Sequence, residues 1–174
     1  MKMRNLLSEM KLEQVDYPEM ISDLKIIYDE FGGPAGIGNG SKFNKFDVIK
    51  RLSKNFPPKN PKVAYRAMTF SKETQFDENM ISKWVSGIRS WSKSKAGAMY
   101  YSWSHHYSPL RIFFVYESPQ ILIDGDMLNK KAKLLNVDEP LDYGEVMIDG
   151  TGLKMIDHKI DYSKDVPLYI VNVR

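Results

Sequence analysis

Three side chains of different chemistry are spaced along this chain: an arginine, a serine and a glutamate. Arg66 lies inside the apolar stretch 63–68, where a guanidinium needs an anion, either a structural carboxylate or a pyrophosphate that suits its planar fork. Ser90 begins Ser90-Trp91-Ser92, a pattern that is also typical of simple helix capping. Glu145 opens an apolar run, and a lone glutamate there is typical of a solvated strand end.

The run that begins at Glu145 is predicted to be a strand. Val146 and Ile148 have high β propensity, and the sequence 149–152, Asp-Gly-Thr-Gly, offers the positive-φ positions that a reversing chain needs. The pattern therefore predicts a hairpin into residues 153–156, with Glu145 at a rigid strand end.

The other elements follow from hydrophobic periodicity and from turn residues. Helical spacing predicts helices over 16–31, 43–56, 77–86, 92–103 and 126–135, the last capped by Asp126. Short β-rich runs predict strands over 62–70, 88–92, 110–117, 120–124 and 167–173. Helices come first and strands later, which indicates an α+β fold.

Length and composition limit the class of protein. At 174 residues with 43% hydrophobic content, the chain is expected to form one domain with a sizeable core. It has no cysteine and three histidines, so no metal site is expected, and the absence of thiols fits a reducing cytoplasm. No run approaches the roughly 20 apolar residues of a membrane span, so a soluble protein without a membrane partner is expected.

The charge is unevenly distributed along the chain. Residues 41–66 carry eight basic residues against one acid, whereas the net charge of the whole chain is +3. A basic helix could bind an acidic partner or nucleic acid, but lysines between apolar residues are more often the solvated face of an amphipathic helix.

The order of Arg66, Ser90-x-Ser92 and a glutamate ahead of a strand resembles the Arg-Ser-Glu class of mono-ADP-ribosyltransferases, and most closely the small bacteriophage enzymes that modify host proteins. The resemblance implies that NAD is the substrate. It implies that Glu145 hydrogen-bonds the 2′-hydroxyl of the nicotinamide ribose, that Ser90 holds Glu145, and that Arg66 binds the phosphates or the adjacent ribose. It also implies that NAD contacts the backbone of Ala67, Ser92, and aromatic rings between Tyr100 and Tyr107.

The same resemblance implies the architecture: a split β-sandwich of two small sheets with N-terminal helices. Residues 1–60 would be the helical part and residues 61–174 the NAD-binding core of a single domain. The target-recognition turn would be 134–144, with Asp142 and Tyr143 as its candidate residues. Tyr143 stands where arginine-modifying members have a second glutamate, so the acceptor could be another residue type, unless Asp142 or Glu139 substitutes.

Three functions follow from these observations. The first is an NAD-dependent ADP-ribosyltransferase, acting as a monomer on a host protein, or on nucleic acid, in the host cytoplasm. The second is a catalytically degenerate binding protein that docks a partner through the basic helix. The third is an NAD glycohydrolase, which shares the site and passes the ribose to water.

Overall fold

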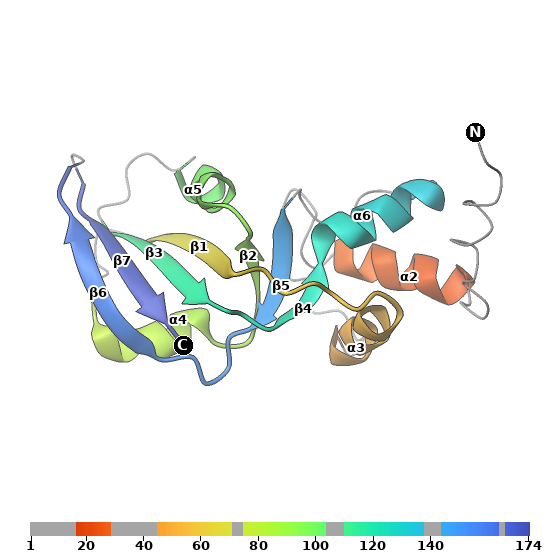
Figure 1. Cartoon of the computed structure of the whole chain (residues 1–174), viewed down its shortest axis with the longest axis horizontal. Helices are drawn as coiled ribbons and strands as arrows, with labels where there is room; N and C mark the ends of the chain where they lie inside the picture. Colours follow the sequence, from red (N-terminus) through yellow and green to blue (C-terminus); the bar gives the residue numbers. More distant parts are fainter. Residues whose placement is uncertain (1–16, 29–44, 71–74, 104–109, 138–143, 164–165) are drawn as a thin grey trace.

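The computed structural model describes residues 17–28, 45–70, 75–103, 110–137, 144–163 and 166–174. Seven strands form a sheet in the order β4-β5-β2-β1-β3-β7-β6 (Figure 1). The strands are β1 (Val63–Phe70), β2 (Ile88–Ser92), β3 (Leu110–Glu117), β4 (Ile121–Asp124), β5 (Glu145–Asp149), β6 (Met155–Asp161) and β7 (Leu168–Val173). All neighbouring pairs are antiparallel except β3 and β7, which are parallel.

The sheet consists of two groups of strands with a narrow joint. β1 and β3 are paired along eight residue pairs and β2 and β5 along five, but β1 meets β2 at the single pair Tyr65 and Ser92. In Figure 1, β2 and β5 run steeply across the direction of β3 and β7. The expected α+β fold is confirmed, and the two expected small sheets are the two halves of one hydrogen-bonded sheet.

Three helices surround the β4–β5 end of the sheet: α2 (Tyr17–Ile27), α3 (Lys45–Asn55) and α6 (Gly125–Leu134) (Figure 1). Their buried side chains form one core with the strands. It includes Leu24 from α2, Leu52 from α3, Leu128 from α6 and Met147 from β5. The two N-terminal helices therefore pack directly behind the strand that carries Glu145.

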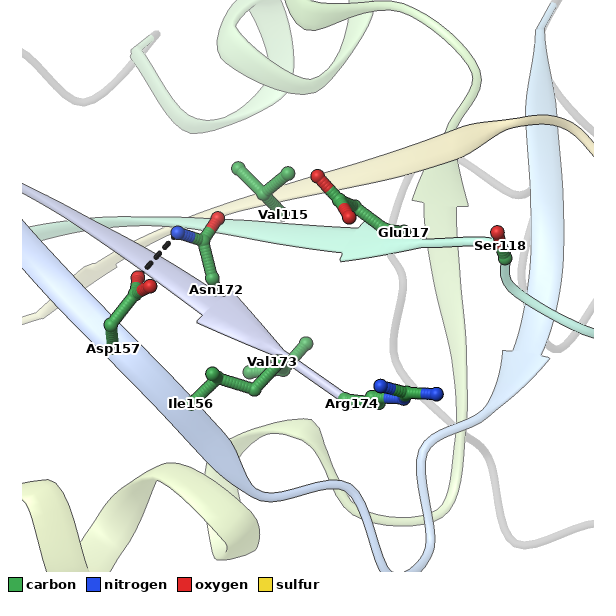
Figure 2. Close-up of a pocket in the computed structure, with 8 residues that line it drawn as sticks. All are labelled: Val115, Glu117, Ser118, Ile156, Asp157, Asn172, Val173 and Arg174. Atoms are coloured by element: carbon green, nitrogen blue, oxygen red, sulfur yellow. Dashed lines mark hydrogen bonds between the residues drawn. The ribbon is translucent and has the colours of Figure 1, made fainter.

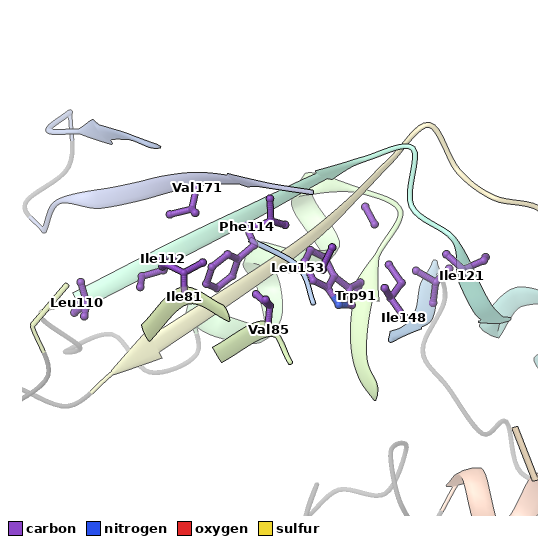
Figure 3. Close-up of a cluster of buried hydrophobic side chains, with 13 residues drawn as sticks. Ile81, Val85, Trp91, Leu110, Ile112, Phe114, Ile121, Ile148, Leu153 and Val171 are labelled. Carbon is purple, nitrogen blue, oxygen red and sulfur yellow. The ribbon is translucent and has the colours of Figure 1, made fainter. Parts of the chain in front are cut away.

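The remaining helices cover the two faces of the sheet. The short 3-10 helix η2 (Glu78–Met80) leads into α4 (Ile81–Val85), which packs on a core that includes Phe114 and Trp91 (Figure 3). Phe113 points to the opposite face, because successive strand residues alternate, and there it packs with Ala98 of α5 (Lys95–Trp103). Within the described residues, no helix is long and apolar enough to span a membrane.

The predicted hairpin between residues 145–149 and 153–156 is wrong. β5 lies between β4 and β2, and β6 pairs with β7 at the far edge of the sheet. The turn after β5 is held instead by the segment before β2, because the Gly150 N–H donates to the Gly87 carbonyl at 2.9 Å. A Cβ on Gly150 would lie 1.9 Å from the Val85 carbonyl oxygen. The glycine thus permits a close approach to the α4–β2 connection, and the chain continues to β6 rather than folding back on β5.

The start of α6 also differs from the prediction. Asp124, not Asp126, is its N-cap, and the Asp124 side chain accepts from the Asp126 N–H at 3.1 Å. Asp126 is thereby left in the first turn of the helix, where its carboxylate makes the contacts described below.

Candidate active site

Three neighbouring strands at the joint of the sheet carry the three residues singled out in the sequence. Arg66 lies on β1, Ser90 on β2 and Glu145 at the start of β5, and β2 is the middle strand. The register pairs Tyr65 with Ser92 and Ser92 with Glu145, so these three residues lie side by side on the three neighbouring strands. Residues that are 24 and 55 positions apart in the sequence are thereby in contact.

Ser90 contacts the carboxylate of Glu145 directly. Its hydroxyl donates a short hydrogen bond to Glu145 Oε1, although the residue that Ser90 faces in the register is Met147. Since residues two apart on a strand point to the same face, the bond is a diagonal contact across the β2–β5 pair. It restricts the side-chain rotation of a carboxylate that is only half-buried.

Arg66 reaches the same serine from the other side. Its Nη1 donates to the backbone carbonyl of Ser90 at 2.5 Å, while its Nε is buried without a hydrogen-bond partner in the described part of the chain. The pKa of Arg66 is lowered to about 10: burial is the largest cause, repulsion from Arg89 adds to it, and attraction to Glu145 opposes both. The site therefore holds a positive charge that the protein stabilises poorly.

The other predicted cofactor-binding residues are placed as follows. Ser92 is buried and its hydroxyl accepts from the Ser94 N–H at 3.1 Å, so it caps the turn into α5. Ala67 pairs with Phe113 of β3, next to Arg66 on β1. Tyr100 is 78% exposed on α5. The predicted site residues Tyr107, Asp142 and Tyr143 lie outside the described residues.

Sequence reasoning missed a second polar cluster beside Glu145. The Lys93 ammonium is 2.6 Å from Asp124 Oδ1 and 2.8 Å from Asp126 Oδ2. The other oxygen of the Asp126 carboxylate accepts from the Gly144 N–H at 2.8 Å, and the Lys93 N–H donates to the Gly144 carbonyl at 2.8 Å. The available signal was a lysine directly after Ser92 and an Asp-Gly-Asp sequence at a strand-to-helix junction.

Two cavities border the half of the sheet that contains β3 and β7. One of about 370 Å³ is bordered by Val115, Asp157, Asn172 and Arg174, where the Asn172 amide donates to Asp157 (Figure 2). The second, of about 420 Å³, lies beside α5 and includes Tyr65. Among the described residues, no group of three histidine, aspartate or glutamate side chains is arranged to hold a metal ion.

Comparisons with known proteins find similarity in structure only. No protein-family model matches the sequence, and no curated protein matches it. Among solved structures, the ADP-ribosyltransferase Vis in complex with agmatine matches at TM-score 0.43 and 13% identity, over 94% of this chain and 76% of Vis. Vis is a toxin from Vibrio splendidus.

Two further matches are bacterial ADP-ribosyltransferases. Plx2a, a toxin from Paenibacillus larvae, matches at TM-score 0.43 and 15% identity, over 96% of this chain and 89% of Plx2a. An ADP-ribosyltransferase from Clostridium botulinum matches at TM-score 0.35 and 12% identity, over 91% of this chain and 80% of the botulinum protein. These scores are too low to assign a reaction, so a function for this chain has to be argued from its own site.

Proposed function

We propose that this protein is an NAD-dependent mono-ADP-ribosyltransferase that cleaves the bond between nicotinamide and ribose and transfers ADP-ribose to a macromolecule. One observation carries the proposal: Ser90 binds Glu145 through its hydroxyl and Arg66 through its carbonyl. A carboxylate, a hydroxyl that orients it and an incompletely paired guanidinium are the groups that this reaction requires.

Glu145 is assigned the central role in bond cleavage. The nicotinamide of NAD is already cationic, so it leaves as a neutral molecule with the bonding electron pair and needs no proton. Positive charge then develops on the ribose, where a fixed carboxylate that also accepts from the 2′-hydroxyl stabilises it, as carboxylates do in glycosidases. Ser90 keeps the Glu145 carboxylate oriented before the substrate binds, which lowers the cost of reaching the reactive geometry.

Arg66 is assigned to the phosphates of NAD or to the adjacent ribose. In the described part of the chain the Arg66 Nε is buried and unpaired, and the pKa of Arg66 is lowered, so this guanidinium gains more from an incoming anion than one already paired with a carboxylate. Ala67 follows Arg66 on β1 and is assigned a backbone contact to the nicotinamide amide. Ser92, Tyr100 and Tyr107 complete the proposed contacts to NAD.

Transfer is completed when a nucleophilic atom of the acceptor bonds to the ribose carbon that nicotinamide leaves, and the acceptor loses its proton. A host protein is the proposed acceptor, with Asp142 and Tyr143 as target-recognition residues. Nucleic acid is the alternative macromolecule, and water as acceptor would make the protein a glycohydrolase. A single domain over residues 1–174, bacteriophage origin and action as a monomer in the host cytoplasm complete the proposal.

The test is turnover of NAD labelled in its adenylate part, in host-cell extract, by the wild type and by Glu145→Gln. The substitution keeps the size of the side chain and an acceptor for Ser90 but removes the negative charge. We expect turnover to fall by about 100-fold or more, because the group that stabilises the ribose cation is lost, while NAD affinity changes less than about threefold. Glu117→Gln, an exposed glutamate on β3, is the matched control and should not change turnover.

The products distinguish the three functions. Label on a macromolecule supports the transferase, and free ADP-ribose alone indicates a glycohydrolase. No turnover by the wild type would leave the binding protein, and equal turnover by Glu145→Gln would reject the role assigned to Glu145.

A further inference from the structure

Glu145 is anchored from two directions, and only one of them is the Ser90 hydroxyl. The other is the backbone of Gly144, the residue before it. The Gly144 N–H donates to the Asp126 carboxylate and the Gly144 carbonyl accepts from the Lys93 N–H, each at 2.8 Å. Both polar groups of this one peptide position are therefore fixed by residues from other elements.

Gly144 has a backbone conformation that needs such support. Its φ is +74°, in the left-handed region, and a Cβ added there would meet nothing within 4 Å. Space therefore does not explain the glycine, but the backbone conformation does, since left-handed φ favours glycine. Glu145 is the first residue of β5 and pairs there with Ser92, so the backbone of Gly144 sets how the chain enters the strand and thereby how Glu145 is oriented.

The carboxylate that holds Gly144 is itself fixed by Lys93. The ammonium of Lys93 lies 2.8 Å from Asp126 and 2.6 Å from Asp124, the N-cap of α6. Burial alone would raise the pKa of Asp126, but the bonds from Lys93 and the Gly144 N–H outweigh it and hold that pKa below its usual range. Asp126 thus stays an anion and a strong acceptor at neutral pH.

We propose that Asp126 and Lys93 are positioning residues for Glu145. Together they fix the backbone of Gly144 and thereby orient the Glu145 carboxylate toward the substrate. The inference rests on the proposed role of Glu145, to which it adds two residues that do not touch the substrate. Ser90 on β2 holds the carboxylate, and Lys93, the first residue after β2, holds the backbone of Gly144. The start of α6 supplies the third contact.

The same strand offers a matched control. Asp149, at the other end of β5, accepts from the Thr151 N–H at 2.9 Å, so it also makes a bond from a carboxylate to a backbone amide. It lies four residues from Glu145, which is about 13 Å along a strand. Asp149→Ala therefore removes the same kind of bond from the same strand without touching the Gly144 anchor.

The kinetic test compares Asp126→Ala, Asp126→Asn and Asp149→Ala. Misplacing Glu145 should lower kcat by about 100-fold in Asp126→Ala while KM for NAD changes little. Asp126→Asn keeps an oxygen acceptor for the Gly144 N–H, so it should recover kcat to within about tenfold of the wild type. Asp149→Ala should keep the kcat of the wild type. If Asp126 had only a structural role, Asp126→Ala would lower the thermal midpoint without lowering kcat at unchanged KM.

Crystal structures of the same variants decide the inference without any turnover. We expect the Ser90–Glu145 contact to be lost in Asp126→Ala and kept in Asp149→Ala. If Lys93→Met leaves Asp126 on Gly144, Lys93 is not a positioning residue. If Glu145 keeps its position in Asp126→Ala, the inference is overturned, whereas an inactive wild type with the expected displacement overturns only the proposed function.

Discussion

Two arginines in this molecule differ in how their charge is used. Arg51, on α3, donates to both oxygens of Asp23 on α2, from Nε at 2.9 Å and from Nη2 at 2.6 Å, and lies 3.3 Å from Glu19. Its hydrogen bond to Asp23 outweighs desolvation and raises its pKa. Arg66, on β1, donates to a carbonyl from Nη1, its buried Nε has no partner among the described residues, and its pKa is lowered.

The difference separates an arginine that stabilises the fold from one that we propose binds a ligand. Arg51 forms a bidentate pair with Asp23, which is 3% exposed, and this pair connects α3 to α2. The two charges compensate each other within the protein. Among the described residues Arg66 forms no such pair, and its charge costs stability because attraction to Glu145 does not offset its desolvation. Groups that are poorly satisfied in the protein alone are typical of functional sites.

The largest effect is expected when the satisfied arginine is removed. Arg51→Met leaves the buried Asp23 without its counterion, and we expect the free energy of unfolding to fall by about 2 kcal/mol. NAD turnover per folded molecule should not change. Urea unfolding measures the effect, with Lys54→Met on the exposed face of α3 as control, for which a change within about 0.5 kcal/mol is expected. Equal losses in both variants would show that the Arg51–Asp23 pair does not hold the helices.

The opposite pattern is expected at the unsatisfied arginine. Arg66→Met should weaken NAD binding by about tenfold, because the anion contact is lost. It should leave stability equal or higher by up to about 1 kcal/mol, because a desolvated charge is removed. Arg66→Lys keeps the charge without the planar guanidinium, so its NAD affinity should lie between those of the wild type and Arg66→Met. Calorimetry of NAD binding measures the effect.

The control for this experiment is the neighbouring cation. Arg89→Met removes the charge that repels Arg66 and should change NAD affinity by less than about threefold, since Arg89 is exposed and donates to the Ser86 carbonyl. Unchanged NAD affinity in Arg66→Met would mean that its unpaired Nε is a property of the fold and not a ligand site.

The sequence could predict the local part of this site. Strand β2 has the predicted bounds, Ile88–Ser92, and β5 begins at Glu145 as predicted, because β propensity and the flanking turn residues are local signals. The contact between Ser90 and Glu145 was predicted only through a family resemblance. No local pattern specifies that these strands are neighbours.

The errors came from interactions between distant residues. The Asp-Gly-Thr-Gly turn has the composition of a hairpin, but Gly150 binds Gly87, and only the folded chain brings those two together. Asp126 is a residue type that often caps a helix, but Asp124 is the N-cap, and the Asp126 carboxylate instead accepts from the Gly144 N–H. In both cases the residue type indicated a local role, but the residue that it binds is distant in the sequence and could not be identified from the local pattern.

The smallest effect is expected on the solvent face of α3, where the sequence suggested a docking surface for nucleic acid. Arg51 points to α2, so the exposed lysines tested on α3 are Lys50, in the middle of the helix, and Lys54, in its last turn. We expect a Lys50→Gln, Lys54→Gln double variant to leave both turnover and nucleic-acid binding unchanged, since exposed lysines on an amphipathic helix need no partner. Binding of a short duplex at several salt concentrations checks this. If α3 neutralised phosphates, the double variant would reduce the salt slope by about 2, and the basic helix would then be a second functional surface beside the strands.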